Sequence, residues 1–283
     1  MKVVKHNSYY HLGHSFRHEG RVIYKEKYLG KELPKNLEEI KEIFLRECMQ
    51  EGIFKKLRLI QKNFSKEWKK YPESIKKEIL IDLSISFTYN TNAIEGSTIT
   101  LDETEEIIKR KISPNKPLRD VQETISHSKA FFEILNAKKD ISERYILRWH
   151  YKIFSETKPD ISGKFRDYLV RVGNYRAPDW QDINKLMIEF FAWYGKNKKN
   201  MNPVELAARA HYKFEKIHPF GDGNGRIGRL IIAYILRNGN YPLLIIEYKK
   251  RKSYYHALSK TENDFLGWFM RSYVSAHKRH LKE

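Results

Sequence analysis

Twelve consecutive residues in the C-terminal half combine an imidazole, a carboxylate, four glycines and two guanidinium groups. They run from His218 to Arg229 as HPFGDGNGRIGR. Closely spaced glycines bring backbone N–H groups together, and such groups at the start of a helix bind anions. Arg226 and Arg229 are three residues apart, so on a helix both can reach the same phosphate group. The segment predicts a polyphosphate site.

His218 and Asp222 add two further chemical functions to this site. An imidazole with an ordinary pKa of about 6.5 can accept a proton from a hydroxyl group at neutral pH. A carboxylate beside phosphates is a typical ligand of Mg2+, which keeps several waters. Together these residue types indicate transfer of a phosphorus group from a nucleotide to a hydroxyl.

Two other interpretations of the same residues fail. Gly223, Gly225 and Gly228 have the spacing of a dinucleotide-binding turn, but that turn follows a strand, and a helix is expected here. A calcium-binding loop is excluded because Arg226 and Ala233 occupy positions that require oxygen ligands.

The twelve residues match the H-x-F-x-D-G-N-G-R-x-x-R signature of the Fic (filamentation induced by cAMP) family, which the chain therefore resembles. The resemblance extends over roughly residues 80 to 275 through segments on both sides of the signature. These are Pro203–Ala208, His211–Lys213, Tyr241–Pro242 and Tyr254–Leu258.

The resemblance implies a mainly helical Fic core and protein adenylylation, in which AMP passes from ATP to a Ser, Thr or Tyr hydroxyl of a target protein. His218 would be the base and Asp222 the Mg2+ ligand. The intact G-N-G-R part favours AMP transfer over phosphorylation. The residues implied to bind the nucleotide are Gly223, Asn224, Gly225, Arg226, Arg229, Tyr254 and Tyr255.

A short β-hairpin is predicted between Lys164 and Asn174, where apolar and basic residues intermingle. It resembles the flap of Fic proteins, which holds a target segment by main-chain strand addition. The residues expected to form this target-binding flap are Phe165, Tyr168, Val170 and Val172.

Thr91 to Gly96 matches the inhibitory pattern [S/T]-x-x-x-E-[G/N] of the same family. The resemblance implies that Glu95 pairs with Arg229 and keeps this arginine from the γ-phosphate of ATP. In some relatives the same glutamate positions a water that removes AMP from the target. The sequence is therefore compatible with an autoinhibited transferase and with a bifunctional or mainly de-AMPylating enzyme.

The surrounding pattern predicts a mainly α protein with an N-terminal β-rich appendage. Tyr9–Phe16 and Val22–Leu29 flank Glu19-Gly20 as a hairpin. Apolar residues three or four apart predict helices over residues 37–60, 75–89, 101–112, 121–137, 142–155, 183–194 and 206–217. Helix starts are also predicted by two N-cap and capping-box combinations, Thr100 with Glu103 and Asn202 with Pro203 and Glu205. We expect three parts: an appendage over 1–35, a helical region with the inhibitory helix over 36–115, and the Fic core over 116–283.

The net charge of +19 leaves a different class of function open, a basic nucleic-acid-binding protein. Lysines are, however, spread among glutamates over most helices, which is typical of solvated faces. The longest apolar run, Leu230–Leu236, is too short to span a membrane, and the single Cys48 fits a reducing compartment. We expect a cytoplasmic protein that acts on a protein target and has no membrane partner. It could form a homodimer. An interaction protein that binds ATP without turnover is a further alternative.

Overall fold

The described part of this computed structural model divides into two compact units. One unit comprises Met1–Asn63 with His277–Glu283, and the other comprises Phe64–Ala276. The predicted three-part division of the chain stays a prediction. The structure describes residues 1–18, 21–137, 140–173 and 175–282.

The N-terminal unit contains an antiparallel sheet in the order β1-β2-β3. Its strands are β1 (Lys2–His6), β2 (Tyr9–His18) and β3 (Arg21–Gly30). The predicted hairpin corresponds to β2 and β3, and β1 adds a third strand that the sequence analysis missed. The predicted turn at Glu19-Gly20 lies outside the described residues.

Helix α1 (Leu37–Glu51) provides the apolar partner of this sheet. Leu12 of β2 is buried with Phe44 and Cys48 of α1, so Cys48 is a core residue. The prediction of one helix over 37–60 is wrong, because α1 ends before Gly52 and α2 (Ile53–Lys70) begins after it. Glycine costs about 1 kcal/mol in a helix interior, which favours a break at this position.

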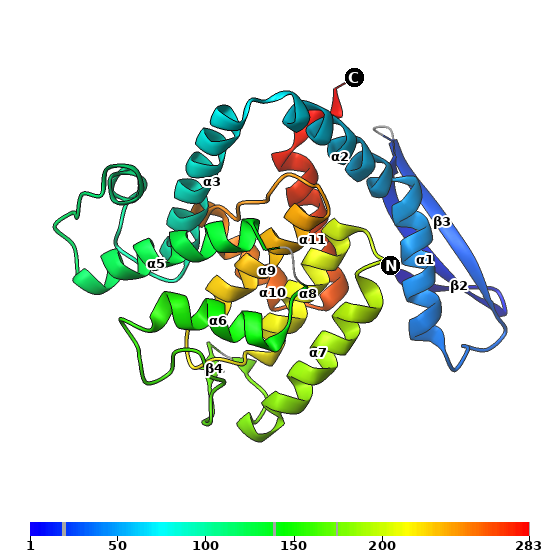
Figure 1. Ribbon diagram of the computed structural model, residues 1–283. Coiled ribbons are helices and arrows are strands. Elements are labelled where there is room, and N and C mark those ends of the chain that lie inside the picture. The colour runs from blue at the N-terminus through cyan, green and yellow to red at the C-terminus, as the bar shows by residue number, and fades with distance from the viewer. Residues whose placement is uncertain (19–20, 138–139, 174, 283) are drawn as a thin grey trace. The chain divides into compact units, whose positions relative to one another are not determined.

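The second unit is mainly helical, as predicted (Figure 1). Its first part holds α3 (Glu73–Ile94), α4 (Leu101–Glu105), a π-helical turn (Glu106–Arg110), α5 (Leu118–Leu135) and α6 (Glu143–Phe154). After a short hairpin come a 3-10 turn (Trp180–Asp182), α7 (Ile183–Asn197), α8 (Pro203–Ile217) and α9 (Asn224–Asn238). A second 3-10 turn (Tyr248–Lys250), α10 (Arg251–Leu258) and α11 (Glu262–Ala276) complete it, and a 3-10 turn (Lys278–Leu281) belongs to the other unit.

Helix α9 is the central element of the second unit. Every residue from Arg226 to Leu236 is buried, which is typical of a helix enclosed by others. Helices α3, α5, α6 and α8 all contact it, and Figure 1 shows it between α6 and α11. This enclosure fixes the position of its N-terminus, where the predicted anion site begins.

Two predicted helix starts are confirmed by their caps. The Asn202 side chain accepts a hydrogen bond from the Val204 N–H at 2.9 Å, with Pro203 in the first turn of α8. Thr100 and Glu103 form a complete capping box at the start of α4. The predicted helix over 101–112 continues from α4 into the π-helical turn, which ends at Lys111 in a left-handed conformation.

The hairpin lies later in the chain than predicted. Its strands are β4 (Arg171–Val172) and β5 (Tyr175–Arg176), and the Ala177 N–H donates to the Val170 carbonyl at 3.2 Å. Phe165 and Tyr168 therefore lie outside the strands. The physical reason is Arg166, whose guanidinium binds three backbone carbonyl groups and so anchors this stretch as an irregular segment.

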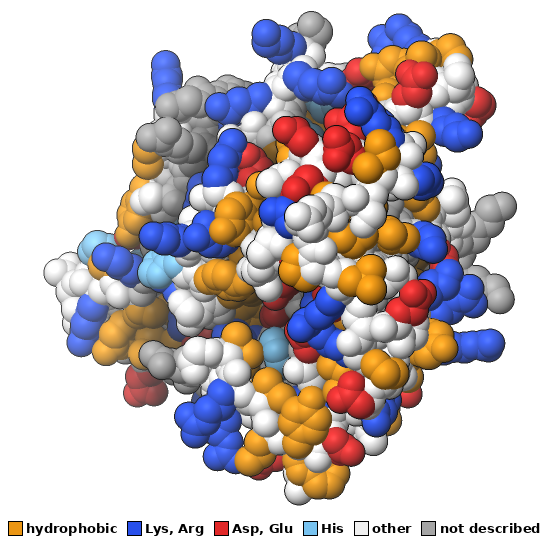
Figure 2. All heavy atoms as spheres, turned by 90° about the vertical axis from the view of Figure 1, so that its left-hand side faces the viewer, with side chains coloured by type: hydrophobic (Ala, Val, Ile, Leu, Met, Phe, Trp, Pro, Cys, Tyr) orange, Lys and Arg blue, Asp and Glu red, His pale blue; other side chains and the backbone are white. Residues whose placement is uncertain are grey.

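Lys and Arg side chains are interspersed with hydrophobic and acidic ones on the face drawn in Figure 2. This mixture is typical of a solvated surface. Within the described residues, no helix combines the length and the apolar character needed to cross a membrane.

Packing between α3 and α5 should carry much of the stability of the second unit. Phe131 of α5 is fully buried, and its ring centroid lies 4.9 Å from that of Phe87 in α3. Phe131→Ala should lower the free energy of unfolding by about 3–5 kcal/mol, through lost burial and a residual cavity. Urea unfolding measures this loss. As the control, Ile188→Ala on the surface of α7, where Ile188 is 64% exposed, should change it by under about 0.5 kcal/mol. Equal effects of both substitutions would contradict this packing.

Candidate active site

The loop from His218 to Gly223 joins the end of α8 to the start of α9. His218 and Gly223 both have left-handed backbone conformations, with φ of 52° and 79°. A Cβ atom at position 223 would also overlap the Phe154 ring, so glycine is required there. The Asn224 side chain closes the loop, because it accepts from the Phe220 N–H and donates to the Phe220 carbonyl, both at 2.8 Å.

Phe220 anchors this loop in the core, beside a histidine that the sequence analysis missed. Its ring stacks on His150 of α6 with centroids 3.9 Å apart. The Gly163 N–H donates to His150 Nδ1, so Nε2 carries the proton and donates to the Asp222 carbonyl. Both hydrogen bonds measure 3.0 Å. A neutral His150 thus ties the loop to α6.

His218 lies at the C-terminal end of α8, largely buried, with its side chain 14% exposed. Its Nδ1 faces the backbone carbonyl oxygen of Glu215 at 3.4 Å. Burial lowers the pKa of His218 below its ordinary value. The imidazole is therefore neutral at pH 7, which is the form that accepts a proton.

The side-chain carboxylate of Glu95 contacts the N-terminal turn of α9. The Glu95 side chain, at the end of α3, lies against the Gly225 backbone, where a Cβ atom would overlap it. Glu95 Oε1 is 2.5 Å from Arg229 Nη2, which also donates to the Thr91 carbonyl at 3.2 Å. Arg229 is 2% exposed. Burial lowers its pKa, but the charge and hydrogen bond of Glu95, together with neighbouring groups, outweigh burial and raise the pKa above its ordinary value.

A second charged cluster adjoins the first and includes two residues that the sequence analysis missed, Glu123 and Lys158. Glu123 of α5 forms an ion pair with Arg226, and Lys158 bridges Glu123 and Asp222. Arg226 Nη2 lies 3.6 Å from Asp222 Oδ2. Burial raises the pKa of Asp222, but the charges of Arg226 and Lys158 outweigh it and lower the pKa below its ordinary value.

The two clusters hold more positive than negative side chains. Arg119, Lys158, Arg226 and Arg229 face the carboxylates of Asp222, Glu123 and Glu95. Withdrawal of Glu95 would increase this positive excess next to the start of a helix. Such an excess attracts anions, and phosphates above all.

Glu215 is a further buried acid that the sequence analysis missed. Burial raises its pKa to about 8, so it is protonated at pH 7. Its Oε2 lies 3.9 Å from His218 Nδ1, and its Oε1 has no hydrogen-bond partner among the described residues. Glu215 thus lies directly behind the imidazole.

The two predicted nucleotide-contacting tyrosines have different surroundings. Tyr254 is buried, and its hydroxyl lies 2.7 Å from His211 Nε2. Tyr255 is 44% exposed and donates to the Ile94 carbonyl at 3.2 Å, next to Glu95. Of the two, Tyr255 has the side chain that a bound molecule can reach.

Of the four predicted flap residues, two contact the signature loop, and the four do not form one strand. The Phe165 ring contacts Phe220 at 5.6 Å between centroids, and the Tyr168 hydroxyl lies against Gly221. Val170 accepts the last hydrogen bond of the hairpin, and Val172 of β4 is exposed. Arg166 holds the whole segment at the site by donating to the His218 carbonyl at 2.9 Å.

Three buried histidines make the fold sensitive to acid. Burial lowers the pKa of His127 and His211 to about 3 and that of His150 to about 4. Because the unfolded chain keeps a histidine pKa of about 6.5, it binds more protons than the folded chain below that pH. Stability is then lost as the pH falls, by about 1.4 kcal/mol per pH unit and histidine.

Glu215 opposes this loss, since its raised pKa makes folding more favourable as the pH falls from about 8 towards its unfolded value of about 4.5. Three histidines against one glutamate leave a net loss of about 2–3 kcal/mol per pH unit below roughly pH 6. Urea unfolding at a series of pH values from neutral to mildly acidic tests this expectation. A free energy of unfolding that stays constant or rises on acidification would contradict it.

Comparison with known proteins supports the family resemblance. Residues 140–236 match the model of the Fic/DOC family. The chain is 32% identical to "Protein adenylyltransferase Fic" of Nematostella vectensis over 189 residues, which is 65% of this chain and 44% of that protein. It is 34% identical to the Drosophila melanogaster protein of the same name over 188 residues, 65% of this chain and 38% of that protein. The chain thus spans less than half the length of these curated relatives.

Solved structures show the same fold. Fic-1 (residues 134–508) of C. elegans superposes with a TM-score of 0.71 and 24% identity, over 87% of this chain and 77% of that one. A Fic domain containing signaling protein of Bacteroides thetaiotaomicron gives 0.69 and 24%, over 81% of this chain and 99% of that one. The signature loop, the helical fold and the matched segment agree: residues 140–236 are similar to the Fic/DOC family, and the described part of the chain has the fold of solved Fic proteins.

Proposed function

We propose that this protein is a protein adenylyltransferase that transfers AMP from ATP to a Ser, Thr or Tyr hydroxyl of a target protein, and that Glu95 inhibits it. The observation that carries the proposal is the place of the Glu95 carboxylate, on Arg229 and over Gly225 at the start of α9. A helix N-terminus with an arginine is a site for phosphate. An internal carboxylate there competes with the nucleotide for the same donors.

The unused donors of Arg229 support nucleotide binding. Among the described residues, its Nε and Nη1 atoms have no hydrogen-bond partner although they are buried. A buried donor without a partner costs about 1–3 kcal/mol. Phosphate oxygens at this position would satisfy these donors, and the two ends of a polyphosphate suit the adjacent guanidinium groups of Arg226 and Arg229.

His218 is suited to act as the general base. A carbonyl oxygen can only accept a hydrogen bond, so the Glu215 carbonyl favours the tautomer with the proton on His218 Nδ1. His218 Nε2 is then free to take the proton of an incoming hydroxyl. The lowered pKa keeps this nitrogen unprotonated at neutral pH.

In the proposed reaction the target hydroxyl oxygen attacks the α-phosphorus of ATP while its proton passes to His218 Nε2. The bond from the α-phosphorus to the oxygen that bridges to the β-phosphorus breaks, and pyrophosphate leaves. Arg226 and Arg229 stabilise the charge that develops on the phosphate oxygens. The chain supplies position, charge and a proton acceptor.

The residues at the site offer one protein carboxylate, that of Asp222, as a ligand for Mg2+. Asp222 has a partly exposed side chain, 42% accessible, with Lys158 now on its Oδ2 atom. Movement of this lysine would free the carboxylate for a cation that keeps its waters. A bound Mg2+ would neutralise phosphate charge, and Asp222 would hold it.

The target would bind at the hairpin. Strands β4 and β5 pair only with each other among the described residues, so one edge of each is open to a further strand. Strand addition is driven by main-chain hydrogen bonds and accepts many side chains. Arg166 ties this hairpin to the His218 carbonyl, which would bring a bound target segment close to the base.

Glu95→Gly should raise self-labelling with AMP at least about tenfold, because it removes a charged hydrogen bond worth about 1.5–3 kcal/mol. The measurement is intact-mass spectrometry after incubation with ATP and Mg2+, which detects added AMP groups. Glu95→Gln, which retains the side-chain length but not the charge, should also raise labelling. The double variant Glu95→Gly, His218→Ala should show none.

Labelling that persists without His218 would show that the imidazole is not the base. Labelling of wild type and Glu95→Gly at the same rate would contradict the proposal that Glu95 inhibits the enzyme. No labelling of any variant, with or without an added protein substrate, would favour ATP binding without turnover.

A further inference from the structure

A pocket lies away from the signature loop, between α3, the π-helical turn and α5. Its volume is about 910 Å³, within the range of ligand sites in proteins. The α5 residues that line it run from Val121 to Phe132. At 1.5 Å per residue these span roughly 16 Å, so the pocket is a long trough beside the helix.

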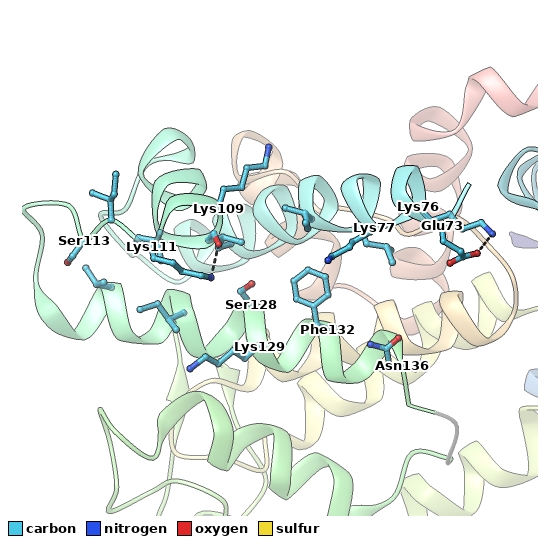
Figure 3. Close-up of a pocket in the computed structure, with 17 residues that line it drawn as sticks. Glu73, Lys76, Lys77, Lys109, Lys111, Ser113, Ser128, Lys129, Phe132 and Asn136 are labelled. Atoms are coloured by element: carbon cyan, nitrogen blue, oxygen red, sulfur yellow. Dashed lines mark hydrogen bonds and ion pairs between the residues drawn. The ribbon is translucent and has the colours of Figure 1, made fainter. Parts of the chain in front are cut away.

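The walls of this trough are apolar. Leu80 and Ile81 of α3 face it together with Ile108, Ile125 and Phe132. All five side chains are half-buried, so each still has apolar surface that a ligand could cover. Figure 3 shows the Phe132 ring rising from α5 towards α3. Burial of such surface favours an apolar ligand.

Lysines surround the trough. Its lining includes one carboxylate, Glu73, which is already paired with Lys76 at 2.6 Å. Lys77 and Lys129 have no hydrogen bond or ion pair among the described residues, and Figure 3 shows Lys77 directed towards Phe132. The five lysines are Lys76, Lys77, Lys109, Lys111 and Lys129.

Few of the side chains that line the pocket could form hydrogen bonds with a polar ligand. Ser128 is already hydrogen-bonded to Ser84 at 2.9 Å, which leaves Ser113 and Asn136 as the other neutral polar side chains. A nucleotide base or a sugar would lose hydrogen bonds to water without replacement. The long apolar trough with unpaired ammonium groups instead matches a chain with one charged end.

We propose that this pocket binds an amphiphilic anion, namely an unbranched apolar chain that ends in a carboxylate, as in a fatty acid. The chain would lie along α5 over Ile125 and Phe132, and the carboxylate would pair with Lys77 or Lys129. Lysine stems can cover the apolar chain while their ammonium groups stay in water. The pocket shares α3 with Glu95 but shares no residue with the signature loop.

The test is calorimetric titration of the full chain with dodecanoate and with dodecyltrimethylammonium, which has the same chain and the opposite charge. We expect dodecanoate to bind at least tenfold more tightly. The double variant Lys77→Glu, Lys129→Glu should weaken dodecanoate binding at least tenfold. Lys185→Glu with Lys196→Glu, an equal charge reversal on the exposed face of α7, should leave it unchanged.

Equal binding of both amphiphiles would overturn the proposal, because charge would then play no part. Absence of dodecanoate binding, or equal weakening by both pairs of substitutions, would overturn it as well. Dodecanoate should bind His218→Ala as tightly as the wild type, so the result is independent of the proposed AMP transfer.

Discussion

The buried ion pair between Arg229 and Glu95 is the contact on which the arrangement of the site depends. An arginine that is 2% exposed cannot lose its proton in a protein, so its charge needs a partner within the fold. Its hydrogen-bond partners among the described residues are the Glu95 carboxylate and the Thr91 carbonyl, both at the end of α3. The C-terminus of α3 is thereby held at the N-terminus of α9.

Arg226, the other arginine of the signature, is also buried and also has a carboxylate partner, which lies on a different helix. Arg226 is buried against Glu123 of α5, and Lys158 after α6 completes the cluster at Asp222. Removal of one member of a buried ion pair costs several kcal/mol. The two ion pairs therefore hold α3 and α5 against the N-terminal part of α9. At the phosphate site that we propose at the start of α9, an internal carboxylate, that of Glu95, already neutralises the charge of Arg229. A nucleotide would replace one anion with another and need not create a site.

Sequence reasoning was strongest where function and local structure depend on neighbouring residues. The signature, the capping box at Thr100 and the N-cap at Asn202 could be predicted because each involves residues a few positions apart. Glu123 and Lys158 could not, since each lies more than 60 positions from its signature partner and a single charged residue is usually solvated. Arg166 misled the prediction of the hairpin, because alternation of residue types does not reveal a guanidinium that binds backbone carbonyls.

The central claim is that the Glu95 carboxylate occupies the phosphate site of α9. Its most direct test is calorimetric measurement of the ATP affinity of wild type and of Glu95→Gly, with adenosine, which has no phosphate, as the control ligand. The account predicts that Glu95→Gly binds ATP about tenfold more tightly, while the adenosine affinity of the two proteins is the same. Equal ATP affinity in both proteins, or an equal gain for adenosine, would contradict it.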